Sequence, residues 1–130
     1  MKTILIISTL LICGTAQAES YGMHLGSYHT EPGHNNFNPG LYVRTADLND
    51  MPVTLQAGAY KNSIGHNTAY VAGNLSYGGT SLTLGAATGY LLPVIPILVL
   101  SQRVDHFRLS YVPKYSALNK GHTFHISYEF

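Results

Sequence analysis

Three residues of the chain have side chains that could act together in nucleophilic catalysis. His29 can serve as a general base, Ser63 carries a hydroxyl nucleophile, and Asn62 precedes that serine. A serine becomes a nucleophile when a histidine takes its proton and a third group orients the imidazole, and an asparagine fills this third role in some sites. The alternative is that all three are solvated residues at the ends of strands, and spacing alone leaves both interpretations open.

The sequence contains no comparable pattern for a metal ion, a phosphate group or nucleic acid. Its 7 histidines and 1 cysteine form no H-x-x-x-H or C-x-x-C spacing, and it has no Gly-rich phosphate loop. The formal net charge is +1, without a basic patch. We therefore expect no metal site, no cofactor and no nucleic-acid partner.

The residues with catalytic potential must be positioned by strands, because apolar residues recur at every second position. The clearest case is 122–130, where Phe124, Ile126, Tyr128 and Phe130 alternate with polar residues. Similar segments bounded by turn residues predict strands over 21–29, 41–45, 53–60, 68–77, 81–89 and 106–112, and the fully apolar stretch 94–100 is predicted as a further strand. The pattern predicts an all-β fold, an eight-stranded antiparallel up-and-down barrel that spans a membrane, which is the smallest barrel of this kind.

Composition and the N-terminal residues point to the outer membrane. Residues 1–18 have a basic start, an apolar run and an A-x-A ending, which predicts a secretory signal peptide and a barrel over 19–130. Charged residues make up 10% of the chain, against about 25% in soluble domains. Ten Tyr and 13 Gly suit aromatic girdles and tight bends. Export with the N-terminus in the periplasm places the connections after strands 1, 3, 5 and 7 outside, so His29, Asn62 and Ser63 meet at the outer mouth.

The interior of the barrel is expected to be apolar on one side. Residues 94–100 are apolar on both faces, and the preceding strand offers Gly85, Ala87 and Gly89 to the lumen. Large side chains on one strand next to small residues on its neighbour predict a slot for an acyl chain. The alternative is a dry core that side chains fill completely. Pro93 and Pro96 cannot donate to a strand ladder, so they predict a weak seam in the wall near its outer end. Together with the three small residues of the preceding strand, they are the expected substrate-binding residues of the slot.

These segments resemble a known family. The stretches 60–63 (Tyr-Lys-Asn-Ser), 91–98 (Leu-Leu-Pro-Val-Ile-Pro-Ile-Leu) and 111–113 (Tyr-Val-Pro), followed by the aromatic closing strand, are similar in order and spacing to the outer-membrane lipid A palmitoyltransferases. The resemblance identifies the chain as a divergent and shorter member. It implies transfer of an acyl chain from a phospholipid to lipid A, with Ser63 as the catalytic serine, Asn62 in place of an aspartate, and His29 as the histidine.

Other functions remain open at this point. A small barrel of the same fold could bind lipid, mediate adhesion or protect the envelope without catalysis. A soluble periplasmic barrel could bind an apolar ligand. We expect membrane lipids as partners and a monomer.

Overall fold

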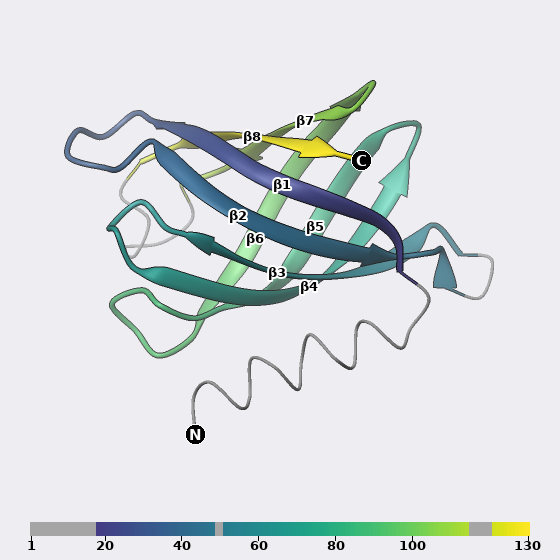
Figure 1. The fold of residues 1–130 in the computed structure, drawn as a ribbon, viewed down its shortest axis with the longest axis horizontal. Coiled ribbons are helices and arrows are strands. Elements are labelled where there is room, and N and C mark those ends of the chain that lie inside the picture. The colour runs from purple at the N-terminus through teal and green to yellow at the C-terminus, as the bar shows by residue number, and fades with distance from the viewer. Residues whose placement is uncertain (1–17, 49–50, 115–120) are drawn as a thin grey trace.

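A computed structural model describes residues 18–48, 51–114 and 121–130. Within them the chain forms one closed barrel of eight antiparallel strands, each paired with its neighbours in sequence, and β8 closes on β1 (Figure 1). The strands are β1 (Ala18–His29), β2 (Phe37–Thr45), β3 (Val53–Lys61), β4 (Asn67–Tyr77), β5 (Thr80–Ala87), β6 (Ile95–Val104), β7 (Phe107–Val112) and β8 (Thr123–Glu129). The predicted fold class is confirmed. The expected signal peptide lies almost entirely outside the described residues.

The largest differences from the predicted strand boundaries are at the start of β2 and the end of β6. β2 begins at Phe37, before the predicted start at Leu41, although Asn38, Pro39 and Gly40 are turn residues. Tertiary contacts override that local signal: the Asn38 side chain is buried, accepts a hydrogen bond from the Ser27 hydroxyl and donates to the Lys61 carbonyl at 3.0 Å. β6 continues to Val104, although a turn was expected from 102, so its polar end is also part of the wall.

The barrel is apolar outside and polar inside. Buried residues include thirteen polar or charged ones but five hydrophobic ones, the reverse of a soluble protein. Large hydrophobic residues are instead exposed on the outer wall: Leu41, Leu55, Val71, Leu75, Leu82, Leu84, Leu100, Leu109 and Phe124. The outward apolar faces expected for β3, β4, β5, β7 and β8 are thus present.

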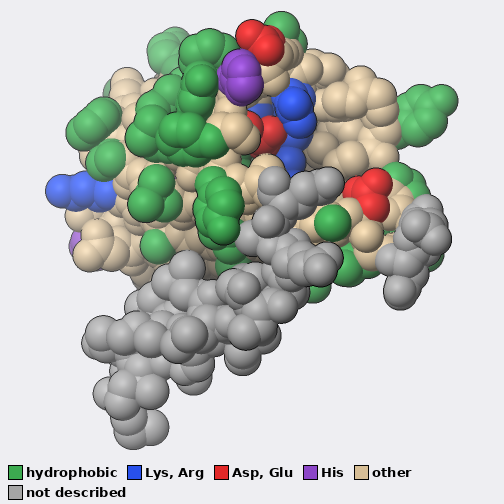
Figure 2. Space-filling view, turned by 45° about the vertical axis from the view of Figure 1, so that its right-hand side comes forward, with side chains coloured by type: hydrophobic (Ala, Val, Ile, Leu, Met, Phe, Trp, Pro, Cys, Tyr) green, Lys and Arg blue, Asp and Glu red, His purple; other side chains and the backbone are tan. Residues whose placement is uncertain are grey.

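The two ends of the barrel differ in their connections. At one end, called here the turn end, β4 and β5 are joined by Gly78 and Gly79, both with positive φ, and β6 and β7 by the short turn at Asp105. The opposite end, called the mouth, carries the connections 30–36, 62–66 and 88–94, together with the described residues 113–114 and 121–122 between β7 and β8 (Figure 1, left). Figure 2 brings the turn end forward and shows charged side chains gathered there beside a hydrophobic flank.

One seam of the wall is incomplete towards the mouth. The ladder between β6 and β7 runs from Val104–Phe107 to Leu100–Tyr111 and records no pair beyond that point within the described residues. Residues 95–99 of β6 continue to pair with β5 on their other side. Pro113 follows β7 and has no backbone N–H to extend the ladder. The described residues contain no helix long and apolar enough to cross a membrane.

Candidate functional site

The interior is closed at the turn end by a buried ionic cluster, which we call the floor. Glu129 on β8 accepts a hydrogen bond from Arg108 Nε at 2.7 Å and one from the Tyr42 hydroxyl at 2.9 Å. Arg44 Nη1 lies 3.1 Å from the same carboxylate, and Arg44 Nη2 donates to Gln56 Oε1 at 2.7 Å. Two guanidinium groups and one carboxylate give 2 − 1 = +1, so the floor carries an excess positive charge.

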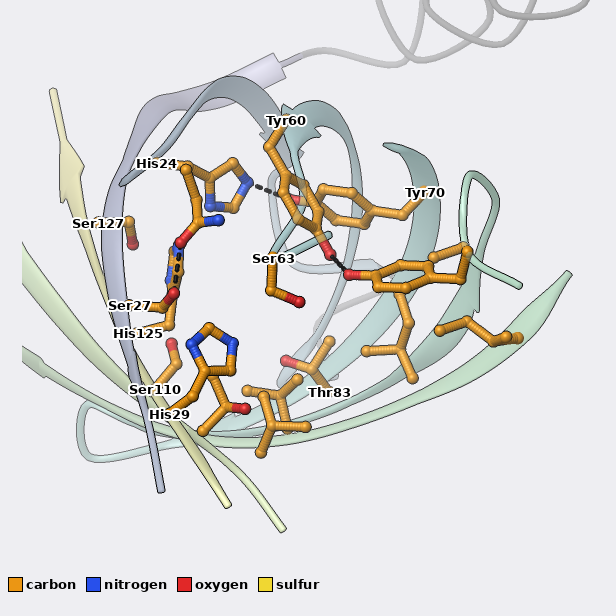
Figure 3. A pocket seen from close by; sticks show the side chains of 18 of the residues that line it. His24, Ser27, His29, Tyr60, Ser63, Tyr70, Thr83, Ser110, His125 and Ser127 are labelled. Carbon is orange, nitrogen blue, oxygen red and sulfur yellow. Dashed lines mark hydrogen bonds between the residues drawn. The ribbon is translucent and has the colours of Figure 1, made fainter. Parts of the chain in front are cut away.

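A cavity of about 620 Å³ occupies the lumen between the floor and the mouth. This volume is in the range of roughly 300–1,000 Å³ found for small-molecule sites. Its walls have different character (Figure 3): β1, β7 and β8 contribute histidines and serines, whereas β6 contributes Ile95, Ile97 and Val99. On the fully apolar stretch 94–100, either alternate set of residues could face the lumen, and in the structure these three do. The lumen is therefore amphipathic and not evenly apolar.

His29 and Ser63 meet at the mouth of this cavity, as their strand positions predicted. Both line it, and Figure 3 shows both side chains pointing inward. The connections that carry them are joined directly, because the Asn35 amide donates to the Ser63 carbonyl at 2.7 Å. No hydrogen bond between the two side chains is recorded among the described residues, and such catalytic contacts often tighten only when substrate binds.

The residue that orients His29 is Asn36. His29 Nδ1 lies 3.1 Å from Asn36 Oδ1, an acceptor, so Nδ1 carries the proton and Nε2 keeps its lone pair. His34 stacks on the imidazole with ring centroids 4.7 Å apart and further restricts its rotation. This arrangement prepares Nε2 to accept a proton at the mouth.

Asn62, expected in that orienting role, holds its own loop together instead. Its side chain is completely buried; Nδ2 donates to the Gly89 carbonyl at 2.8 Å and to Thr68 Oγ1 at 3.0 Å. Oδ1 accepts from the backbone amides of Ile64 and His66 at 3.1 and 2.9 Å. All the polar groups of Asn62 are thus used to join two mouth loops. The residue that orients the His29 imidazole is Asn36 and not, as predicted, Asn62.

We expect Asn62→Asp to destabilise the barrel. An aspartate keeps the acceptors for the two backbone amides but places a carboxylate oxygen against the Gly89 carbonyl in place of a donor. A buried group left without its partner costs about 1–3 kcal/mol. Urea unfolding in lipid vesicles measures the loss. Asn67→Asp, at an exposed position at the start of β4, is the control that should unfold like wild type; equal stability of both variants would contradict the role given to Asn62.

Of the residues expected to line an acyl slot, Ala87 and Pro96 border the cavity. Gly85 faces inward, but a side chain there would collide with Val71 and Ala72, so its role is close packing of β4 on β5. Gly89 has φ +86° and lies against the Asn67 carbonyl, outside the cavity lining. Pro93 is exposed in the connection before β6 and does not line the cavity. The slot assignment is thus corrected for Gly85, Gly89 and Pro93.

Two tyrosines cover part of the cavity on the β5–β6 side. The Tyr60 and Tyr90 hydroxyls are 2.7 Å apart, and both rings line the cavity (Figure 3). Desolvation by burial raises the pKa of the Tyr90 phenol, so it stays neutral and acts as a hydrogen-bonding group.

His24 on β1 and His125 on β8 lie deeper in the lumen, with ring centroids 5.0 Å apart. His24 Nε2 lies 2.9 Å from the Tyr70 hydroxyl, which also accepts a hydrogen bond from Gln56 Nε2 at 2.6 Å. The tautomer of His24 determines which partner donates in its hydrogen bond with Tyr70.

Sequence reasoning missed the floor and Asn36. The signal for the floor was present: Arg44, Arg108 and Glu129 each occupy an inward position on a strand whose alternate residues are apolar or aromatic. Charges at inward positions of a narrow barrel must pair across the lumen. Asn36 carried a weaker signal, its position in the connection that directly follows His29.

A scan of the chain against models of known protein families finds no match, and a search of curated proteins finds no similar sequence. The likeness to lipid A palmitoyltransferases therefore stays a prediction. Among residues 18–48, 51–114 and 121–130, no group of three or more His, Cys, Asp or Glu side chains is placed to hold a metal ion.

Proposed function

We propose that this protein is an outer-membrane barrel that holds one acyl chain of a phospholipid in its lumen and transfers it to lipid A. The observation that carries the proposal is the 620 Å³ cavity, which has an apolar wall on β6 and is lined at its mouth by His29 and Ser63. An ester held there would have its chain in the cavity and its head group at the aqueous rim. The chemistry requires no cofactor.

The distribution of side chains supports a membrane location. Leucine, valine and phenylalanine side chains are exposed around the wall, while arginine, glutamate and asparagine are buried inside. Lipid-facing walls of outer-membrane barrels have this pattern, with aromatic residues near both interfaces. Tyr77, Phe107 and Phe130 are exposed near the turn end, and Tyr28, Phe37 and Phe124 near the mouth. A closed barrel needs no partner strand, so we propose a monomer.

We expect the protein to fractionate with outer membranes and to migrate faster on gels when it is not boiled. Phe130→Asp should reduce the assembled, heat-modifiable fraction, because a carboxylate would replace an exposed aromatic ring that packs on Tyr128 with ring centroids 5.3 Å apart. Phe130→Leu is the matched control and should assemble normally. Recovery of the wild-type protein as a periplasmic monomer without detergent would contradict the membrane location.

The incomplete β6–β7 seam offers a lateral path for the acyl chain. On β6, Ile95, Ile97 and Val99 line the cavity, and the ladder between β6 and β7 stops at Leu100 within the described residues, so the cavity reaches the wall beside this seam. A phospholipid in the surrounding leaflet could pass its chain through this seam without leaving the membrane.

In the proposed reaction, His29 Nε2 accepts the Ser63 proton as Oγ attacks the ester carbonyl. The tetrahedral intermediate collapses, the C–O bond to the lysophospholipid breaks, and the imidazolium returns the proton to that leaving alcohol. A lipid A hydroxyl then attacks the acyl-serine, with His29 again accepting the proton and returning it to Ser63. Asn36 keeps the required tautomer through both steps.

Ala87 gives a direct test of acyl binding in the lumen. Ala87→Met should shorten the preferred acyl chain, because Ala87 is almost fully buried, lines the cavity and faces Ile95 across the β5–β6 pair. Mass spectrometry of the transferred chain measures the effect. Ala86→Met places the same side chain on the lipid-facing side of β5 and should leave the length unchanged. Equal chain lengths for both folded variants would argue against an acyl chain beside Ala87.

A further inference from the structure

Two polar side chains that line the cavity below its mouth have no hydrogen-bond partner among the described residues. His125 on β8 and Ser110 on β7 form a directly opposed pair in the β7–β8 ladder, and both line the cavity. The neighbouring inward hydroxyls are engaged: Ser27 donates to Asn38 and Thr83 to Asn74. Figure 3 shows His125 and Ser110 on the same wall as Ser27 and His29.

A third unsatisfied group adjoins this pair. His24 Nδ1 is buried and has no hydrogen-bond partner among the described residues, and the His24 ring is in contact with the His125 ring. The middle of the lumen therefore contains a buried ring nitrogen without a partner, next to an imidazole and a hydroxyl that line the cavity. Native interiors rarely leave a buried polar atom without a partner, so His24 Nδ1 calls for an explanation.

These polar groups can hydrogen-bond to water in an empty, hydrated lumen, but they could not hydrogen-bond to a plain hydrocarbon chain. Such a chain would displace water and bury them without partners, which is unfavourable for each group. The opposite wall of Ile95, Ile97 and Val99 suits a hydrocarbon chain. The cavity therefore matches a chain that is apolar on one side and carries a hydrogen-bonding group on the other.

The depth of the pair fixes where that group lies on the chain. Ser27, the β1 partner of His125, is two residues below His29, or roughly 6.7 Å along the strand and about 5 Å along the axis of a tilted barrel. An extended chain advances roughly 1.2 Å per bond, as a polypeptide advances about 3.6 Å over three. The polar group thus belongs about four bonds below the reacting ester, near the third to fifth carbon.

We propose that the lumen selects an acyl chain bearing a hydroxyl group near its carboxyl end, bound by His125 and Ser110. The hydroxyl can donate to an imidazole nitrogen and accept from the serine, so it satisfies both groups at once. This inference rests on the proposed function, since it names the class of chain held at that site. A gain of 1.4 kcal/mol corresponds to tenfold, so we expect about tenfold or greater preference over the plain chain.

The test uses the full-length Ser63→Ala protein, which should bind substrate without turning it over. Native mass spectrometry in detergent compares retention of three lysophosphatidylcholines offered at equal concentration, with a plain hexadecanoyl chain, its 3-hydroxy derivative, or its terminally hydroxylated derivative. The 3-hydroxy lipid should be retained about tenfold more than either competitor. Adding Ser110→Ala should reduce that ratio severalfold. Adding Ser76→Ala, which removes an inward hydroxyl bonded to Ser81 outside the cavity lining, should leave it unchanged.

The outcomes separate this inference from the proposed function. Equal retention of the plain and 3-hydroxy lipids by the Ser63→Ala protein overturns the selection but leaves the acyl site standing. Retention of none of the lipids overturns both. A preference that survives both Ser110→Ala and His125→Gln places the recognition elsewhere and overturns the assignment to this pair. His125→Gln is the second variant because glutamine retains a polar side chain in the buried wall and should fold.

Discussion

Ser63→Ala and His29→Ala should each lower acyl transfer by 10²–10⁴-fold, a range typical for loss of a general base or its partner. The reason is geometric: both side chains line the mouth of one cavity, and Asn36 holds the His29 imidazole with Nε2 available. The measurement is acyl transfer by purified protein from phospholipid to lipid A, followed by mass spectrometry of membrane lipids from cells with each variant.

Stability is the internal control for this experiment. Neither Ser63 nor His29 belongs to the floor, so both variants should unfold at nearly the wild-type urea concentration. Thr80→Ala removes an exposed hydroxyl at the turn end and should keep full activity. If wild type, Ser63→Ala and His29→Ala leave identical lipids, the transferase proposal fails and a lipid-binding barrel without catalysis becomes the better interpretation.

The second large effect is expected at the floor. Glu129→Ala removes the carboxylate that Arg108, Arg44 and Tyr42 share and leaves two buried guanidinium groups without compensation. Removing one partner of a buried ion pair costs about 3–5 kcal/mol. Urea unfolding in lipid vesicles, followed by the loss of heat-modifiable migration, should reveal a loss of this size.

Asp105→Asn provides the matched control for charge. The Asp105 side chain is 83% exposed in the β6–β7 turn, and asparagine tolerates its positive φ. Its stability should lie within about 0.5 kcal/mol of wild type, as for most surface substitutions. If Glu129→Ala were as stable as Asp105→Asn, the floor would contribute little to holding the barrel closed.

The number of strands could be predicted from sequence because, outside the apolar stretch of β6, outward-facing apolar residues alternate with residues that face the lumen. The errors occurred where local and tertiary signals conflict. Asn38 and Pro39 have turn propensity, but the Asn38 amide is held by Ser27 and Lys61, residues far away in the sequence. The apolar stretch of β6 has no alternation, so only the barrel could decide that Ile95 faces inward.

The sequence predicted at which end of the barrel the candidate site lies, but not the individual contacts within it. Strand direction alone placed His29 and Ser63 at one end. The partner of His29 depends on the path of the 30–36 connection, which no periodicity encodes. Asn62 adjoins Ser63 in sequence, yet its side chain points into the loop towards Gly89. The side chains of adjacent residues in such turns can point in different directions. The position of Asn62 next to Ser63 therefore did not mean that its side chain reaches His29.

The position of the floor carboxylate has a consequence for how the barrel assembles. The two buried arginines are on β2 and β7, whereas Glu129 is on β8, the strand that joins β7 to β1. A sheet that stops at β7 would therefore have two open edges and two inward-facing arginines without their shared counter-ion. Insertion of β8 removes both penalties in one event. Partly closed forms are disfavoured twice, so assembly should be strongly cooperative, with open sheets scarcely populated at equilibrium.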